Sequence, residues 1–237
     1  MLFISPPFGN YISLPGTTSI KGSFTLEERT GLLKQIITTL RYSFFYSGWV
    51  NKIGLRNKGI KSIQSYSNDN VYSIAILDQS DIDKFNDIIP KDACIEINVS
   101  CPNVKHKLLH ENIKLLNSGK RKWCMVKISP NTSFEEIDSL YNLGFRQFHC
   151  CNTFPCDKGG ISGPILIPHV KKYINYIKTE YPDAEVIAGG GISNINILKE
   201  YQDIGADHFS ISTVCFNPFL FTKLYYNWYT IDKLKDY

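Results

Sequence analysis

The sequence lacks any apolar run of the roughly 20 residues that a membrane-spanning helix needs. Its first residues, MLFISPPFGNY, have neither the basic segment nor the apolar segment of an export signal. Its 26 basic and 22 acidic residues are interspersed, so the net charge of +4 is not concentrated in a basic stretch that would favour nucleic acid. We therefore expect a cytoplasmic protein that binds neither a membrane nor a nucleic acid.

Seven cysteines are present, but no two of them form a C-x-x-C pair. This spacing excludes the usual zinc motifs and the cysteine-ligated iron–sulfur motifs. The odd number and the placement of several cysteines in apolar runs are typical of reduced thiols that pack as small hydrophobic side chains. Paired carboxylates, a Ser-His-Asp order and a histidine-rich metal pattern are also missing, so neither a hydrolase nor a metalloenzyme is favoured.

What the sequence does contain is a repeated alternation of short strand-like and helix-like segments. Near-continuous apolar runs such as CIEINV and EVIAG indicate strands buried on both faces, as parallel sheets require. The chain of 237 residues also matches the size of one α/β barrel. We predict a single domain over residues 1–237, a (βα)8 TIM barrel, with an irregular excursion over one mouth at residues 41–72. The predicted strands are residues 2–5, 19–24, 71–77, 94–100, 125–129, 147–153, 185–189 and 208–214, and the predicted helices are residues 133–143, 169–179, 194–201 and 216–237.

In such barrels the active groups gather where strands end and the following loops begin. The glycine run at 189–191 follows the seventh predicted strand and opens a helix that Ser193 or Asn194 can cap. Free backbone N–H groups at a helix start attract an anion, although a tight turn alone would also explain the glycines. Ser212 and Thr213 end the eighth strand beside this run, and the pair of loops together predicts a phosphate site.

Polar groups also end the other predicted strands. Lys127 ends the fifth, where an ammonium group either pairs with an anion or an electron-rich ring edge, or reaches solvent. A ring of carboxamides offers both donors and acceptors, which suits a flat polar heterocycle, although each asparagine alone could serve a turn. The asparagines in question are Asn51, Asn98, Asn103 and Asn152.

Cys101 follows the fourth predicted strand, close in sequence to Lys105 and His106. A thiol has an ordinary pKa of about 8.5, and nearby cations could lower it enough for a proton acceptor or nucleophile. An unreactive loop cysteine is the alternative. The glycine-rich loop at 158–164 allows either close approach to a flat ligand or a tight turn.

These motifs, taken in order, resemble the dihydroorotate dehydrogenase family over most of the chain. IEINVSCPN (95–103) resembles the family's strand-four signature, MVKISPN (125–131) its strand-five lysine motif and NKIGLRNKGI (51–60) its substrate loop. KGGISGP, AGGGIS and GADHFSISTV follow in the family's order. The resemblance implies an FMN-containing barrel that oxidises dihydroorotate to orotate in pyrimidine biosynthesis.

The resemblance also implies a role for each matching residue. Cys101 would remove the C5 proton of dihydroorotate while a hydride leaves C6 for flavin N5. Lys127 would stabilise negative charge at the pyrimidine edge of the flavin. The implied substrate-binding residues are Asn51, Asn98, Asn103, Asn152 and Thr153, and the implied FMN-binding residues besides Lys127 are Gly159 and Gly160 behind the ring and Gly190, Gly191, Ser212 and Thr213 at the phosphate.

The branch of the family can be inferred from the base. A cysteine in place of a serine, without an N-terminal membrane helix, resembles the soluble class-1 enzymes. CPNVKH resembles the subgroup that passes electrons through an iron–sulfur flavoprotein partner to NAD, and fumarate remains an open alternative. A homo-oligomer is also expected.

Three features depart from the family pattern. Gly22 stands where the family has a strand-two lysine, with Lys21 one place earlier, and Ser212 replaces a glycine of the phosphate motif. The segments after His106 and around residues 27–50 are also shorter than in the family. These departures leave two alternatives: a trimmed, catalytically impaired barrel that binds FMN, orotate or another phosphate ligand, and a related flavin oxidoreductase that acts on another pyrimidine.

Overall fold

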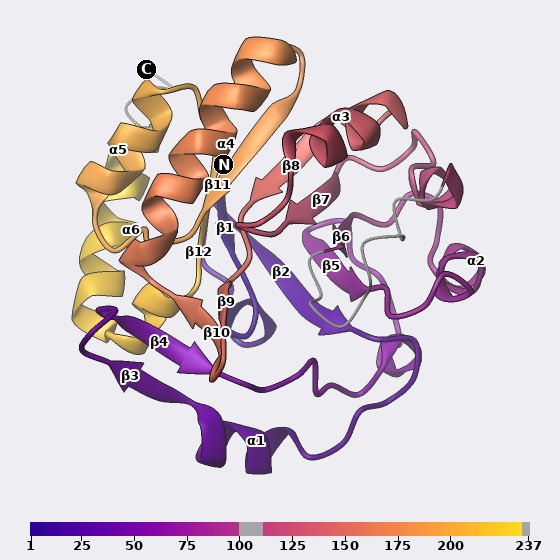
Figure 1. Cartoon of the computed structure of the whole chain (residues 1–237), viewed down its shortest axis with the longest axis horizontal. Helices are drawn as coiled ribbons and strands as arrows, with labels where there is room; N and C mark the ends of the chain where they lie inside the picture. Colours follow the sequence, from indigo (N-terminus) through magenta and orange to yellow (C-terminus); the bar gives the residue numbers. More distant parts are fainter. Residues whose placement is uncertain (100–110, 234–237) are drawn as a thin grey trace.

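Eight parallel strands close into a barrel in the computed structural model, which describes residues 1–99 and 111–233 (Figure 1). The strand order around the barrel is β1-β12-β11-β8-β7-β6-β5-β2, and every neighbouring pair is parallel. Each of the eight predicted strands is confirmed, and the predicted TIM barrel with them. Their bounds are β1 Leu2–Ile4, β2 Thr17–Phe24, β5 Asn70–Ala75, β6 Ile95–Asn98, β7 Cys124–Ile128, β8 Gln147–Cys150, β11 Glu185–Gly189 and β12 His208–Ile211.

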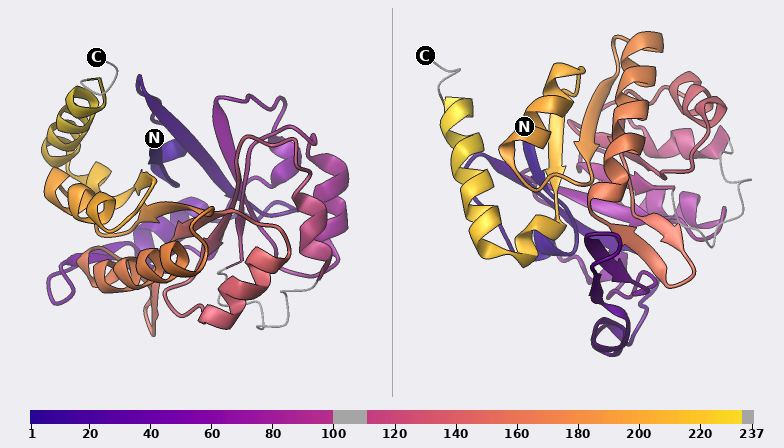
Figure 2. Two further views of the ribbon diagram at one scale, coloured as in Figure 1. Left: turned by 90° about the horizontal axis from the view of Figure 1, so that it is seen from above. Right: turned by 60° about the vertical axis from the view of Figure 1, so that its left-hand side comes forward.

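Helices cover the outside of the barrel, and the later ones lie close to the predicted positions (Figure 2). The helix predicted at 133–143 begins after Ser133, whose hydroxyl accepts from the Glu136 N–H while the Glu136 carboxylate accepts from the Ser133 N–H. Asn194, rather than Ser193, caps the helix predicted at 194–201. The helices are α1 Leu32–Thr39, α2 Asp81–Ile88, α3 Phe134–Asn142, α4 Ile167–Glu180, α5 Ile195–Asp203 and α6 Pro218–Lys233.

The alternation of strand and helix is incomplete. The connection from β1 to β2 holds only a 3-10 turn, η1 Phe8–Asn10, because its prolines at positions 6, 7 and 15 do not suit a helix interior. The described part of the connection from β6 to β7 holds the 3-10 segment η4 Glu111–Leu116. Two further 3-10 segments, η5 Pro164–Leu166 and η6 Thr213–Phe216, follow β10 and β12, and η2 Ile60–Ser62 precedes β5.

The excursion predicted at 41–72 contains regular structure that the sequence pattern did not indicate. β3 Arg41–Ser43 and β4 Gly48–Asn51 form a four-stranded antiparallel sheet with β9 Phe154–Cys156 and β10 Gly159–Ser162, in the order β3-β4-β10-β9. The glycine-rich stretch that we expected to be a loop is therefore a hairpin strand. β10 and β4 lie about a hundred residues apart in sequence and are paired through Gly160 and Asn51.

The interior of the barrel has two layers of different character. Its lower layer is apolar, and the Phe3 and Trp123 rings there meet edge to face with centroids 5.0 Å apart. Above it, toward the carboxyl ends of the strands, the buried side chains are polar or charged: Ser5, Ser73, Glu96, His149 and Ser210. Buried polar groups need partners, and this upper layer is where the candidate site lies. No helix within residues 1–99 and 111–233 is both long enough and apolar enough to cross a membrane.

Candidate active site

A pocket of about 100 Å³ opens at the carboxyl ends of the barrel strands, with walls from β1, β7, β8, β11, β12 and the segment after β10. This is the end of the barrel at which the sequence predicted the chemistry. The structure brings together there the following predicted site residues: Lys127, Asn152, Thr153, Gly190, Gly191, Ser212 and Thr213.

One end of the pocket is a cradle of backbone N–H groups, which we define as those of Gly190, Gly191, Ser212 and Thr213. None of these four donates a hydrogen bond to another described group. The φ angles of Gly190 and Gly191, +118° and +76°, turn the backbone in a way that favours glycine. The Ser212 hydroxyl donates to the Pro6 carbonyl at 2.9 Å, and the Ser212 backbone N–H has no described acceptor. Unpartnered amides converging from two loops fit a phosphate group.

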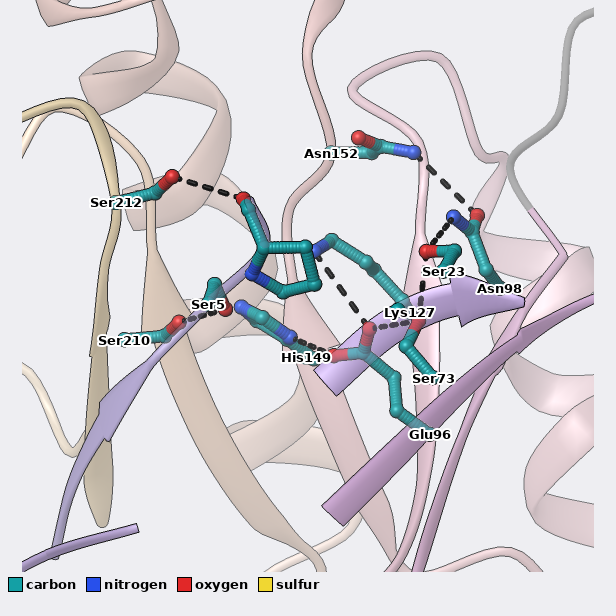
Figure 3. Close-up of polar contacts among 12 residues, drawn as sticks. Ser5, Ser23, Ser73, Glu96, Asn98, Lys127, His149, Asn152, Ser210 and Ser212 are labelled. Carbon is teal, nitrogen blue, oxygen red and sulfur yellow. Dashed lines mark hydrogen bonds and ion pairs between the residues drawn. The ribbon is translucent and has the colours of Figure 1, made fainter. Parts of the chain in front are cut away.

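The floor of the pocket contains a buried charge cluster around Glu96 (Figure 3). Lys127 Nζ lies 3.7 Å from Glu96 Oε1, and the Ser73 hydroxyl donates to the same oxygen at 2.7 Å. His149 Nδ1 is hydrogen-bonded to Glu96 Oε2. Burial alone would raise the pKa of Glu96, but Lys127, His149 and Ser73 outweigh it and lower that pKa to about 2. Glu96 is therefore an ionised carboxylate beneath the pocket.

Asn98 and Asn152 are linked to this carboxylate by a chain of hydrogen bonds (Figure 3). Asn152 Nδ2 donates to Asn98 Oδ1 at 3.4 Å, and Asn98 Nδ2 donates to the Ser23 hydroxyl at 3.4 Å. Since the Ser73 proton is directed at Glu96, the Ser23 hydroxyl donates to Ser73 Oγ over their 2.8 Å separation. Every donor in this chain points toward Glu96, so the chain connects both amides to the carboxylate.

The thiols of Cys150, which ends β8, and Cys151, which follows it, are not suited to act as bases in this pocket. Cys151 is part of the wall, and burial raises its pKa to about 12 despite the opposing charge of Lys127. Burial also raises the pKa of Cys150 well above its usual value. Both thiols stay protonated near neutral pH. The predicted base Cys101 and the predicted ligand Asn103 lie outside the described residues.

Four predicted residues that the structure describes lie outside the pocket wall: Asn51, Asn98, Gly159 and Gly160. Asn51 ends β4, where its Oδ1 accepts from the Ile53 N–H at 3.4 Å. A Cβ at Gly159 would lie 2.0 Å from the Asn51 carbonyl oxygen, and one at Gly160 would lie 2.3 Å from Thr153 Oγ1. Close packing of the chain on itself therefore accounts for both glycines, and their contact with a flavin ring stays a prediction.

Gly22 occupies a backbone position that no lysine could take without rearrangement. Its φ is +120°, and a Cβ there would lie 2.5 Å from the Ser73 carbonyl oxygen. The Asn10 side chain holds it from both sides, accepting from the Gly22 N–H at 2.8 Å and donating to its carbonyl at 3.1 Å. Lys21 does not replace the missing lysine, because Ile20 packs inside the barrel and alternation turns Lys21 to the other face of β2.

Sequence reasoning missed the buried members of the upper layer. Glu96 and His149 sit in the apolar runs CIEINV and FHCC, and an ionisable residue at an inward position of such a strand was the available signal. Ser5 and Ser210, whose hydroxyl oxygens are 2.6 Å apart, were hidden because serine is common in many environments.

Comparison with known proteins points to one family. A family model described as dihydroorotate dehydrogenase matches residues 11–227. The chain is 26% identical over 257 residues to the protein named dihydroorotate dehydrogenase B (NAD(+)), catalytic subunit, of Thermotoga maritima, covering 91% of this chain and 93% of that one. It is 27% identical to the protein of the same name from Bacteroides fragilis, and that match covers 81% of this chain and 73% of the relative. The fold is similar to that of ligand-free DHODH from Eimeria tenella, with a TM-score of 0.72, 16% identity, and coverage of 94% of this chain and 81% of that chain.

The buried Glu96 carboxylate makes a specific prediction for pH dependence. Its pKa is about 2 when folded against an ordinary 4.5, so its stabilising effect is complete above pH 4.5 and is lost as the pH falls toward 2. A shift of this size corresponds to about 3 kcal/mol. Urea titrations between pH 2 and 7 should show this loss in the wild type but not in Glu96→Gln. Glu200→Gln, which removes an exposed ion pair with Lys171, should keep the wild-type pH profile; the same profile in Glu96→Gln would contradict the assignment.

The steric environment of Gly22 leads to a prediction about stability. Gly22→Ala should lower the free energy of unfolding by about 2–3 kcal/mol, because strain at positive φ adds to the contact with the Ser73 carbonyl. Gly119→Ala is the matched control, since its φ is +69° but no atom lies within 4 Å of the added Cβ, and it should cost about 1 kcal/mol. Urea unfolding at neutral pH measures both. Equal losses in the two variants would show that the contact at Gly22 is unimportant.

Proposed function

Since the chain belongs to the dihydroorotate dehydrogenase family, we propose that it oxidises dihydroorotate to orotate in pyrimidine biosynthesis, with FMN as its cofactor. The observation that carries the proposal is a single pocket lined by a lysine, by a carboxamide that is hydrogen-bonded to a second one, and by a cradle of unpartnered amides. Each group in this set matches one part of the chemistry: the cradle a phosphate, the lysine an electron-rich ring edge, and the amides a pyrimidine.

The residues present fit FMN. The cradle would hold its phosphate by charge-assisted hydrogen bonds from backbone N–H groups, and Lys127 would face the pyrimidine edge of its ring. FMN, when bound, supplies the acceptor for the hydride that leaves C6 of dihydroorotate. Lys127 would stabilise negative charge at that edge, and Glu96 fixes its ammonium group at one place on the pocket floor.

The substrate's own polar edges would be read by the carboxamides. Asn98 and Asn152 are already oriented through Ser23 and Ser73, so they need little reordering to bind C=O and N–H groups. Asn51, Asn103 and Thr153 complete the proposed substrate set. Cys101 is the proposed base for the C5 proton, because the raised pKa values of Cys150 and Cys151 make both of these thiols unsuitable for that task.

The visible spectrum of the purified protein under nitrogen tests this function. We expect flavin absorption bands that bleach when dihydroorotate is added. Cys101→Ala should keep the bands but slow the bleaching by at least about a hundredfold, the usual contribution of a positioned base. Stopped-flow absorbance gives the rate, and Cys156→Ala, a change at a cysteine outside the pocket wall, should bleach like the wild type.

The other outcomes separate the remaining alternatives. Unchanged bleaching in Cys101→Ala would refute the base. A yellow protein that dihydroorotate does not bleach would favour either the trimmed barrel or an enzyme that acts on another pyrimidine. The lack of space for a side chain at Gly22 supports the trimmed barrel. A protein that cannot take up FMN would refute the cofactor.

We further infer that the electrons leave through a separate iron–sulfur flavoprotein subunit to NAD. Support comes from the name that the bacterial relatives share, which describes a catalytic subunit of an NAD(+) enzyme. The homo-oligomer expected from the sequence also stays a proposal, and light scattering of the purified chain would test it.

The isolated chain should therefore reduce its flavin with dihydroorotate but form no NADH. Absorbance at 340 nm would follow NADH, and an artificial dye acceptor would serve as the positive control for turnover. Rapid NADH formation by the chain alone would contradict the need for a partner. Turnover with fumarate at a comparable rate to the dye would instead favour fumarate as the acceptor.

A further inference from the structure

His149 is a buried histidine on the pocket floor to which the proposed function assigns no role. Its side chain is 2% exposed, and one ring nitrogen, Nδ1, is hydrogen-bonded to Glu96. No described group is hydrogen-bonded to the other nitrogen, Nε2. A Cβ at Gly189 would come within 2.5 Å of Nε2, and both residues line the pocket, so the free nitrogen lies on the pocket side of the ring.

The charge cluster sets the protonation state of His149. Glu96 already faces one cation, Lys127, and a second buried cation would lack a counter-charge of its own. Burial lowers the pKa of His149, Lys127 lowers it further, and the attraction of Glu96 does not compensate. His149 is therefore a neutral imidazole that donates Nδ1–H to Glu96. Its Nε2 then carries a lone pair, which makes it a hydrogen-bond acceptor directed at the pocket.

The strand order determines which part of a ligand would meet this acceptor. β8, which carries His149, lies between β7 with Lys127 and β11, which leads into Gly190 and Gly191. The proposed function places a ring edge at Lys127 and a phosphate at the glycine pair. The part of FMN that joins ring to phosphate is the ribityl chain, and its hydroxyls are donors. The nearby hydroxyls of Ser5 and Ser210 are bonded to each other, whereas His149 Nε2 has no hydrogen-bond partner among the described groups and can accept from a ribityl hydroxyl.

We propose that His149 is a further cofactor-binding residue, whose Nε2 accepts a hydrogen bond from a ribityl hydroxyl of FMN. The proposal rests on the proposed function for the identity of the cofactor. Glu96 is then a positioning residue for two side chains. Its carboxylate fixes the ammonium group of Lys127, and it selects the His149 tautomer whose Nε2 can accept a hydrogen bond.

Nitrogen NMR of the wild-type chain labelled with ¹⁵N-histidine tests the proposal without relying on activity. The apo protein should show His149 as the neutral tautomer protonated at Nδ1, and addition of FMN should move its Nε2 resonance upfield, as accepting a hydrogen bond does. His149→Gln assigns the resonance. His169 on α4, which packs against Phe154 and does not line the pocket, should not respond to FMN.

Affinity measurements identify the donor. His149→Leu should weaken FMN binding about five- to tenfold, the usual effect of one net hydrogen bond, whereas the control His169→Gln should bind like the wild type. Three FMN analogues, each lacking one ribityl hydroxyl, identify the donor. One of them should bind the wild type about five- to tenfold more weakly than FMN does, but should bind His149→Leu as tightly as FMN binds that variant. If His149→Leu does not fold, the comparison of the three analogues by the Nε2 shift of the wild type decides the same point.

The results distinguish this proposal from the one on which it rests. Two results would overturn the hydrogen bond alone: normal FMN binding that leaves the Nε2 resonance unmoved, or normal FMN binding in which every analogue loses the same affinity with His149→Leu as with the wild type. A wild-type chain that does not bind FMN would overturn both the hydrogen bond and the cofactor. A chemical shift showing that Nε2 is protonated in the apo protein would overturn the acceptor role, whatever the affinity for FMN.

Discussion

The Glu96 carboxylate, fully buried inside the barrel, is the constraint on which the site depends. A charge in that position is unfavourable unless cations and donors surround it. Lys127, His149 and Ser73 do so, and through Ser73 the requirement extends to Ser23, Asn98 and then Asn152. An apolar residue at 96 would avoid the cost of burial, but it would leave the lysine and the imidazole without an anchor. Burial of this one ion therefore costs stability, and the same ion holds the groups that face the ligand in fixed positions.

The same constraint explains why the barrel interior changes character along its axis. Side chains from the strands fill the lower layer with apolar rings and branched chains, which need no partners. Two residues further along each strand the alternation returns to the interior, and there serine, glutamate, histidine and glycine replace them. Small residues such as Gly189 leave space above the charged ones. The pocket at this end of the barrel therefore forms where the packing of large side chains stops.

Local patterns predicted the parts of the fold that depend on local forces. Apolar periodicity marked all eight barrel strands, and Ser133 and Asn194 marked helix starts because a cap bonds within its own turn. The amide cradle was predictable for a similar reason, since backbone N–H groups need only glycines and a strand end. The Glu96 cluster was not, because its members come from separate strands and their contact depends on register. The pairing of β10 with β4 was missed because glycine-rich segments favour loops and the partner is distant in sequence.

The absence of a lysine at position 22 of β2 changes the electrostatics that the cofactor would meet. The family pattern has a lysine where Gly22 stands, and Lys127 is the one lysine or arginine in the described pocket wall. Part of its charge is already balanced by Glu96, and His149 is neutral. An anionic ligand must then be held mainly by neutral donors: the backbone amides of the cradle and the carboxamides of the mouth. Such donors bind through direction and distance more than through charge, so this site depends on the exact placement that the buried carboxylate enforces.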